Sequence, residues 1–463
     1  MSARLFPASL ALLAGFALAG DVRAADPPAE PGTIEPIDAD AHDEDPAEAP
    51  AAAATTSGGI SLDDVRTFTA VLSLVKQAYV DPVDDHALMQ AAIKGLLVGL
   101  DPHSEYLEAS ELTQLNEDTS GSYEGLGIEV SAVDGALRVI APIDDTPAAR
   151  AGIKPGDTIL RIDNVPVQAD NLADAVDMLR GAPGSEVSLS ILRAGASVPQ
   201  EFKLKRETIR VASVRGRLLE PGFAYLRVSQ FQAETGADLR KRVARLQKDN
   251  GKPLLGAVLD LRSNPGGLLN SAVEVSDLLL DSGTIVTTRG RIRESEMAFR
   301  ATPGDALDGA PLVVLIDNGS ASAAEIVAGA LKDNHRGLLM GRRSFGKGSV
   351  QTVLTLDDAH AIKLTTARYY TPSGISIQAA GIQPDIELAD LALSENEDDA
   401  SRISERDLRN HLKGEAETSG GTPTLATVRS GAPRDYALSE ALNALKAMAL
   451  QRRLTSPTQE KKG

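Results

Sequence analysis

Apolar residues follow three different patterns along the chain, and each pattern predicts a different kind of structure. Between residues 61 and 98 they recur every three or four positions, which indicates helices. From about residue 123 to 206 they form short runs separated by glycine turns, as in a small β-domain. From residue 216 to 388 strand-like runs alternate with helical ones, which is the pattern of an α/β core.

Two helices are expected in the first of these regions. Ser61 and Asp64 form a capping box at the start of the first helix, and Pro82 ends it. Its apolar positions are Val65, Phe68, Leu72, Val75 and Tyr79. The second helix is expected over Asp85–Val98. Together they predict a helical N-terminal region at residues 60–121.

The first 24 residues have the features of a signal peptide. Arg4 precedes an apolar run from Leu5 to Leu18, shorter than the ~20 residues of a transmembrane helix, and Val22-Arg23-Ala24 fits a cleavage site. An uncleaved anchor is the alternative. Residues 25–59 are rich in Ala, Pro and acidic residues, so we expect a disordered linker. With no later apolar stretch of ~18 residues, we expect an exported protein in a bacterial periplasm, soluble or peripherally associated with the membrane.

Composition narrows the classes of function. The 463 residues are 42% hydrophobic, which predicts a folded chain of several domains. The absence of cysteine excludes disulfide frameworks, zinc–thiolate sites and a thiol nucleophile. A formal net charge of −18 argues against nonspecific nucleic-acid binding, because that binding needs a basic face. No metal or other cofactor is expected.

The glycine-turn region has the order of elements found in a PDZ domain. The turn Gly125-Leu126-Gly127-Ile128 opens a strand, and further strands, a helix over Leu172–Leu179 and a strand from Val187 follow. Taken alone the turn is ordinary, but in this order residues 122–206 resemble a PDZ domain. Such a domain directs backbone amides at the terminal carboxylate of a peptide, which extends the sheet edge. The residues expected to line the pocket for the last side chain of the peptide are Leu126, Ile128, Leu172, Val176 and Leu179.

In the α/β region two buried strands end in glycine-bearing turns that lead into helices. The strand Ala257–Leu261 is followed by Arg262-Ser263-Asn264-Pro265-Gly266-Gly267, and the strand Leu312–Ile316 is followed by the turn from Asp317 to Ile326. Open α/β sheets place their chemistry at such turns, because the N-terminal amides of helices face the crevice and can hold an anion.

Ser322, in the second turn, is the candidate nucleophile. It precedes a helix of small residues that leave its hydroxyl accessible, and the next amide, that of Ala323, is placed to donate to a developing oxyanion. The alternative is that Ser320 or Ser322 only caps the helix, which is the commonest function of serine at that position.

Lys347 is the candidate general base. No Gly-x-Ser-x-Gly motif indicates a histidine-based hydrolase, whereas Lys347 follows Ser322 by 25 residues in a glycine-flanked turn before a strand. Burial would lower the pKa of the amine, and Phe345 and Val350 are the expected apolar walls. Gln351 is placed to orient the amine through its side-chain oxygen. The alternative is a solvated surface lysine without a function.

Together these motifs resemble the C-terminal processing peptidases, also called tail-specific proteases, over about residues 60–390. The matching segments are Ser-Ala-Ser-Ala-Ala-Glu-Ile, the lysine and glutamine that follow it, the upstream Asp-Leu-Arg-x-Asn-Pro-Gly-Gly, and the PDZ-like region. The resemblance implies a multidomain α/β protein whose crotonase-like catalytic core spans residues 207–390. It also implies a Ser–Lys catalytic pair, with Ser322 as nucleophile and Lys347 as general base.

The same resemblance implies functions for the surrounding residues. Gln351 would hold the lysine, and the oxyanion hole would use the amides of Ala323 and of one glycine in the Gly266–Gly267 pair, of which we favour Gly267. The residues expected to be structural or to shape the turns are His103, Asp260, Arg262 and Glu325. The implied activity is that of a serine endopeptidase that captures protein C-termini through its PDZ domain. Bacterial relatives can also depend on lipoprotein adaptors.

Three other interpretations remain at this point. Gly341 to Lys347 fits the spacing of a phosphate-binding loop, but Gly348 replaces the Ser or Thr that holds magnesium, and a β-pattern follows. A crotonase-like acyl-processing enzyme would use the same glycine turns, although an exported protein would lack coenzyme A. A catalytically silent PDZ scaffold or adaptor would require Ser322 or Lys347 to be unproductive.

The C-terminal region, residues 391–463, contains two leucine patterns. Leu408 and Leu412 predict a short amphipathic helix. A second helix is predicted from Leu438, Leu442, Leu445 and Leu450. Leucine stripes at the end of a chain pack on the parent domain or on a sister subunit, so we expect a docking or oligomerisation element and a homo-oligomer. Residues 452–463 should form a loose tail.

Overall fold

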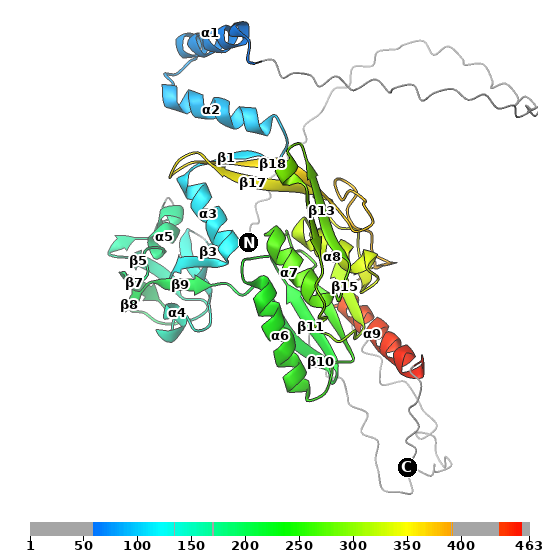
Figure 1. The fold of residues 1–463 in the computed structure, drawn as a ribbon. Coiled ribbons are helices and arrows are strands. Elements are labelled where there is room, and N and C mark those ends of the chain that lie inside the picture. Colours follow the sequence, from blue (N-terminus) through cyan, green and yellow to red (C-terminus); the bar gives the residue numbers. More distant parts are fainter. Residues whose placement is uncertain (1–58, 134, 169–170, 390, 392–434, 456–463) are drawn as a thin grey trace, which may run out of the picture. The chain divides into compact units, whose positions relative to one another are not determined.

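The computed structural model describes residues 59–133, 135–168, 171–389, 391 and 435–455 (Figure 1). The predicted signal peptide and nearly all of the predicted linker lie outside these residues, as do the predicted helix around Leu408 and Leu412 and the part of the predicted tail after residue 455. Residues 452–455, predicted to begin that tail, belong instead to the last helix, Tyr436–Thr455. The chain divides into two units, one ending at Ala78 and the other beginning at Tyr79. None of the helices in the described ranges has both the length and the apolar character needed to span a membrane.

The described part of the first unit consists of helix α1, Leu62–Ala78. The predicted capping box is present: the Asp64 N–H donates to Ser61 Oγ over 3.0 Å, and the Ser61 N–H donates to the Asp64 carboxylate over 3.3 Å. No residue of the helix is buried, and its predicted apolar position Phe68 is 48% exposed. Local capping, rather than burial in a core, therefore defines where α1 begins.

The second unit begins with elements that the sequence predicted only in part. Helix α2, Asp85–Val98, has the predicted bounds, and the Asp84 carboxylate caps it by accepting from the Ala87 N–H over 3.0 Å. The short strand β1, Glu105–Leu107, and helix α3, Ala109–Ser120, were not predicted. Helix α3 ends where Gly121 adopts a left-handed conformation, with φ of 72°.

The PDZ-like region forms one antiparallel sheet with two short helices. The strand order is β3-β4-β5-β7-β8, with β6 paired to β5, so β3 lies at an edge. The strands are β3 Ile128–Val133, β4 Ala136–Pro142, β5 Thr158–Ile162, β6 Val165–Pro166, β7 Glu186–Leu192 and β8 Gln200–Lys205. The helices are α4 Pro147–Arg150 and α5 Leu172–Leu179. A separate pair of strands, β2 Ser122–Gly125 and β9 Glu207–Arg210, joins the two ends of this region.

The α/β core is built on a six-stranded sheet in the order β10-β11-β12-β15-β16-β19. Its strands are β10 Val214–Glu220, β11 Phe223–Val228, β12 Gly256–Asp260, β15 Leu312–Ile316, β16 Leu338–Gly341 and β19 Ile386–Glu387. Strand β10 is antiparallel to β11, and the remaining neighbours are parallel. The predicted buried strands at residues 257–261 and 312–316 are β12 and β15.

Helices cover both faces of this sheet. Because side chains alternate along a strand, Ala257 and Leu259 of β12 join one apolar cluster and Val258 joins another. The first cluster includes residues of α6 Thr235–Asn250, α7 Leu269–Leu279 and α8 Ala323–Asp333, and the second includes residues of α9 Tyr436–Thr455. All five residues of β12 and of β15 are buried, which explains the apolar sequence of β15 and of β12 up to Leu259; Asp260, at the end of β12, is a buried carboxylate.

Helix α9 is the predicted leucine-rich helix, and it packs on its own domain. Its buried positions are Ala441, Leu445 and Ala449, which recur every four residues and therefore share one face. Leu450 was predicted to belong to the apolar stripe but is 58% exposed, because it lies one position beyond that face.

A second sheet, of five strands, also belongs to the second unit. It contains β1, β13 Thr284–Gly290, β14 Met297–Arg300, β17 Ser349–Thr355 and β18 Ala361–Tyr370, with the 3₁₀ helix η1 Arg293–Ser295 between β13 and β14. Strand β17 pairs with one edge of β18. On the other edge β1 pairs with residues 361–363 and β13 with residues 367–370, so no strand of the described ranges pairs with residues 364–366 there.

Candidate active site

The two glycine-bearing turns meet because their strands are parallel neighbours. Strands β12 and β15 pair in register from Ala257 and Leu312 onward, so both end at the same edge of the sheet. The turn after β12 leads into α7, and the turn after β15 leads into α8. The Ala321 N–H donates to the Asn264 carbonyl over 2.9 Å, which joins the two turns directly.

Ser322 occupies the N-cap position of α8 in a strained conformation. Its φ and ψ are 53° and −113°, a region that non-glycine residues rarely adopt. The serine is 7% exposed, and its hydroxyl faces the buried phenol of Tyr369. Ser320 is a structural residue instead, since its hydroxyl donates to the Leu261 carbonyl over 2.8 Å and accepts from the Asp317 N–H over 2.9 Å.

The Gly266–Gly267 pair lies against Ser322. A Cβ on Gly266 would stand 2.9 Å from the Cβ of Ser322 and 3.1 Å from the Ala323 nitrogen, so only glycine fits there. The Gly266 N–H is already bound to Asn264 Oδ1 over 2.8 Å. The Gly267 and Ala323 amides have no hydrogen-bond acceptor among the residues that the structure describes. Of the two glycines, therefore, Gly267 is the one whose N–H has no acceptor in the described part of the chain.

Glu325 connects the serine turn to the lysine turn. Its fully buried carboxylate accepts from the N–H groups of Ser322 and Lys347 through one oxygen, over 2.8 and 2.9 Å. The other oxygen accepts from the Gly346 N–H over 2.7 Å and from the Ser344 hydroxyl over 2.5 Å. Burial raises the pKa of Glu325, and these hydrogen bonds oppose that shift.

Lys347 is half-buried between Gly346 and Gly348, and β17 follows it as predicted. Burial lowers the pKa of its amine, and the positive charge of Lys363 lowers it further, while Glu105 and Asp101 act in the opposite direction. Within the described chain no hydrogen bond joins the Lys347 amine to the Ser322 hydroxyl.

The predicted walls around this lysine are only partly present. Val350 packs against the main core cluster, but Phe345 is 63% exposed and cannot supply an apolar wall. The Phe345 N–H donates to the Ser320 carbonyl over 3.0 Å, so its backbone is held in the turn before β17 while its side chain is exposed. Burial lowers the pKa of His103, in the segment before β1, and the charge of Lys347 lowers it further.

Gln351 lies on β17 next to Lys347's turn, where a bulge interrupts the pairing with β18. Its side-chain Nε2 donates to Ser349 Oγ over 2.9 Å and to Thr365 Oγ1 over 3.2 Å. Its Oε1 has no hydrogen-bond partner within the described ranges. Thr365 and Tyr369 were not predicted as site residues, because both lie on β18, a strand that contains no recognisable motif.

Asp260 and Arg262 shape the first turn, as expected. The buried Asp260 carboxylate accepts from the Arg262 guanidinium over 2.6 Å and from the Tyr225 hydroxyl over 2.8 Å. Arg262 also binds Asp435, the residue before α9, over 2.6 Å. The turn that carries the two glycines is therefore braced by the C-terminal helix.

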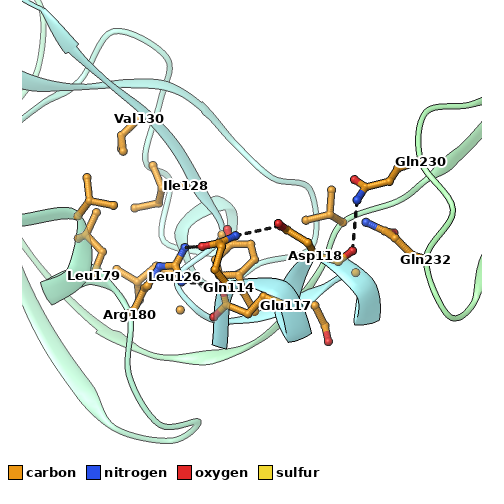
Figure 2. A pocket seen from close by; sticks show the side chains of 17 residues that line it. Gln114, Glu117, Asp118, Leu126, Ile128, Val130, Leu179, Arg180, Gln230 and Gln232 are labelled. Carbon is orange, nitrogen blue, oxygen red and sulfur yellow. Dashed lines mark hydrogen bonds and ion pairs between the residues drawn. The ribbon is translucent and has the colours of Figure 1, made fainter. Parts of the chain in front are cut away.

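The PDZ-like region has a pocket beside the edge strand β3 and helix α5 (Figure 2). Its lining includes the predicted residues Gly125, Leu126, Gly127, Ile128, Val176 and Leu179. The Leu126 and Gly127 N–H groups have no acceptor among the described residues, which suits anion binding. Leu172 begins α5, but its side chain lies outside what the structure describes.

Helix α3 also lines this pocket, which the sequence did not predict. The Arg180 guanidinium at the end of α5 donates to the Glu117 carboxylate of α3 over 2.5 Å, as Figure 2 shows. Gln230, which follows β11, lines the pocket as well and donates to the Asp118 carbonyl over 3.4 Å. The contact between these two helices was hard to predict from the sequence, because Glu117 and Arg180 are far apart along the chain and neither belongs to a motif.

Comparison with known proteins places these features in a family. The sequence model of Peptidase family S41 matches residues 222–388, and that of the PDZ domain matches residues 138–193. A carboxy-terminal-processing protease of Bartonella bacilliformis is 43% identical over 380 residues, which cover 82% of this chain and 87% of that protein. The carboxy-terminal processing protease CtpA of Bacillus subtilis is 36% identical over 69% of this chain and 68% of that protein. A carboxyl-terminal-processing protease of Synechocystis is 38% identical over 67% of this chain and 74% of that protein.

The two family matches define a multidomain α/β protein that combines a PDZ domain with a serine-type peptidase domain. Because the similarity to the Bartonella protein extends over most of both chains, this protein belongs to the carboxy-terminal-processing proteases of peptidase family S41.

Proposed function

We propose that this peptidase uses Ser322 as nucleophile and Lys347 as general base. The observation that carries this assignment is the buried Glu325 carboxylate, one oxygen of which binds the backbone N–H groups of both residues. This contact holds the two turns in one place, although they are separated in sequence. Burial also favours the neutral amine at Lys347, which is the form that a base requires.

In the proposed reaction the neutral Lys347 amine takes the proton of the Ser322 hydroxyl as Oγ attacks the substrate carbonyl carbon. The resulting ammonium gives that proton to the departing peptide nitrogen, the C–N bond breaks, and an acyl-enzyme remains. Lys347 then takes a proton from water, and the hydroxide attacks the ester. The proton returns to Ser322 Oγ, and a new C-terminal carboxylate leaves.

We propose that the Gly267 and Ala323 amides form the oxyanion hole. Both amides lack an acceptor within the described residues; Ala323 follows Ser322 directly, and Gly267 follows Gly266, which packs against Ser322, so a developing negative charge would be their partner. Gln351 would orient the lysine through its free Oε1. The core that carries this site would have the crotonase-like arrangement of glycine turns and helices.

The PDZ domain would select substrates by their free C-terminus. Unpaired N–H groups at Leu126 and Gly127 suit the terminal carboxylate, and the apolar lining from Ile128, Val176 and Leu179 suits an apolar last residue. Chains with loosely ordered tails should be preferred, because a folded terminus cannot extend as a strand along β3.

We further propose that the protein is exported to a periplasm, with residues 1–24 removed and residues 25–59 as a linker. Homo-oligomerisation, which was expected from the C-terminal leucine pattern, and a lipoprotein adaptor, which the family resemblance implies, are part of this proposal. Sequencing the N-terminus of the protein from its native cells tests the cleavage, which should leave Ala25 as the first residue. A mature chain that still begins at Met1 would contradict export by this signal.

The experiment that tests the proposed function is incubation of the protein with an unfolded polypeptide that has a free C-terminus. We expect shortened chains, with rates about 10²- to 10⁴-fold lower for Lys347→Ala and no cleavage for Ser322→Ala. Lys347→Arg should be equally inactive, because a guanidinium does not lose its proton. Lys241→Ala, which changes an exposed lysine of α6, is the matched control. Full cleavage by Lys347→Ala would overturn the base assignment, and no cleavage by the unaltered protein would favour a silent scaffold.

A further inference from the structure

On the edge of β18 that carries β1 and β13, the gap at residues 364–366 is bridged by side-chain hydrogen bonds to Thr365 rather than by a strand. Between the residues paired with β1 and those paired with β13, the Thr365 N–H donates to Ser104 Oγ over 3.1 Å. The Thr365 hydroxyl donates to Asp101 Oδ1 over 3.1 Å. The segment before β1 thereby reaches the strand that adjoins Gln351.

The Asp101 side chain accepts at both of its oxygens. Oδ1 receives the N–H groups of His103 and Ser104 over 2.8 and 3.0 Å, and Oδ2 receives the Ser104 hydroxyl over 2.7 Å. Burial raises the pKa of Asp101, but these hydrogen bonds and that from Thr365 outweigh it and leave the pKa below its usual value. Asp101 is therefore a carboxylate, which can accept hydrogen bonds but not donate them.

This carboxylate determines which way the Gln351 amide faces. The single hydroxyl proton of Thr365 is directed to Asp101, so toward Gln351 the hydroxyl can only accept. The Gln351 atom beside it must then be the donor Nε2. Ser349 alone would not fix this choice, because its hydroxyl can donate or accept.

We propose that Asp101 and Thr365 are positioning residues that orient the Gln351 amide so that its oxygen, not its NH₂ group, is available to Lys347. This inference rests on the proposed function. A neutral amine has two N–H donors and one lone pair. An oxygen at Gln351 takes one N–H and leaves the lone pair for the Ser322 proton, whereas an NH₂ group there would donate to the lone pair and block the base.

The test compares Thr365→Val, which removes the hydroxyl at nearly constant volume, with Thr365→Ser, which keeps it. Thr365→Val should lower kcat about tenfold, as expected for the loss of one oriented hydrogen bond, with KM unchanged. Thr365→Ser should restore most of the rate. Thr366→Val, on the opposite face of β18 and bonded to Thr352, is the matched control and should leave kcat unchanged.

Two measurements separate positioning from a general loss of structure. In a Gln351→Ala background Thr365→Val should have no further effect on kcat, because the amide that it orients is gone. The acid limb of the kcat profile should also move to lower pH in Thr365→Val, because Lys347 loses an acceptor for its ammonium form. The other charged groups that act on this amine, Lys363, Glu105 and Asp101, and the nearby His103, are retained in this variant.

Three outcomes would overturn the inference: kcat unchanged in Thr365→Val, a loss of equal size in the Gln351→Ala background, or a fall in kcat with an unmoved acid limb. The proposed function fails separately, if Ser322→Ala or Lys347→Ala cleaves at the full rate of the unaltered protein. Inactive Ser322 and Lys347 variants beside a fully active Thr365→Val protein would therefore reject the positioning inference alone.

Discussion

At the scale of single residues, Glu325 shows how a buried charge can serve as structure. All four of its contacts are with hydrogen-bond donors, since the Ser344 hydroxyl accepts from the Ile382 N–H over 2.6 Å and so directs its own proton to the carboxylate. A protonated Glu325 would place its own O–H against one of these four groups, which are donors and cannot accept it. The carboxylate is therefore the form that fits its surroundings, despite the raised pKa that burial causes.

Glu325→Gln should therefore damage both stability and activity. The side-chain NH₂ group would face two donors in place of two accepted hydrogen bonds. Each buried donor left without an acceptor costs about 1–3 kcal/mol, so the free energy of unfolding in urea should fall by at least that amount. Glu274→Gln, on the exposed surface of α7, is the control and should change neither property. An unaltered urea midpoint for Glu325→Gln would contradict the four-bond description.

Gly266 gives a second prediction at this scale. Its φ is 104°, and a Cβ at this position would stand only 2.9 Å from the Ala321 carbonyl oxygen, which leaves no room for a side chain. Gly266→Ala should displace the Ser322 turn and reduce cleavage by more than about tenfold. Gly156→Ala, at a glycine with a positive φ but open space around it, separates backbone strain from this contact. Equal activity of Gly266→Ala and the unaltered protein would show that the turns are less closely packed than described.

At the scale of elements, the sequence predicted those with strong local signals. Helix α5 and strand β15 have the predicted bounds, because a continuous apolar run or a helical spacing is flanked by turn residues. The paired turns and the candidates Ser322 and Ala323 followed from the same signals, whereas the choice of Gly267 came from the family resemblance and stays a prediction. Helix α3 and strand β1 were missed, since β1 has three residues and exists only through its pairing with β18.

The remaining parts of the site depend on contacts between distant segments. Asp101 and Thr365 are 264 positions apart, so their hydrogen bond has no signature in the sequence. The exposure of Phe345 likewise depends on how the turn packs in three dimensions, which spacing alone does not show. Residue types were predictable where a motif named them, whereas orientation came from the tertiary structure.

Helix α9 offers a test at the element scale. Leu445→Ala would leave a cavity where the fully buried leucine meets the sheet, and such changes lower the free energy of unfolding by about 2–5 kcal/mol. Leu450→Ala changes the same residue type on the exposed side of the helix and should have little effect. Equal urea midpoints for the two variants would contradict the packing of α9 on its own domain.

At the scale of the whole molecule, the chain combines a peptide-binding domain with a peptidase domain. Among the described residues, the pocket beside β3 offers amides without an acceptor, and Glu325 joins the turn of Ser322 to that of the half-buried Lys347. A substrate that used both sites would be bound through its terminal carboxylate and cleaved at an upstream bond. Selection of a chain end, rather than of a sequence along the chain, is the property that distinguishes this arrangement from a general peptidase.

Amidation of a substrate's C-terminus tests that property. Replacing the carboxylate by a neutral amide removes the charge that the Leu126 and Gly127 amides are proposed to bind. We expect KM to rise about tenfold or more, with a smaller change in kcat. The free acid of the same peptide is the control. Identical KM values for the acid and the amide would remove the basis for carboxylate capture.

The central claim is that Lys347 acts as a neutral base, and its pKa can be measured directly. The Ser322→Ala variant would carry lysine labelled with ¹³C at Cε and would be measured with a peptide bound. The NMR signal that is lost in Lys347→Arg would be assigned to Lys347. The chemical shift of that signal would then be followed against pH. Because burial disfavours the ammonium form, the pKa should lie below the ordinary value of 10.5, and cleavage by the unaltered enzyme should rise with pH through that same pKa. A pKa at or above 10.5 in the peptide-bound protein would contradict the account.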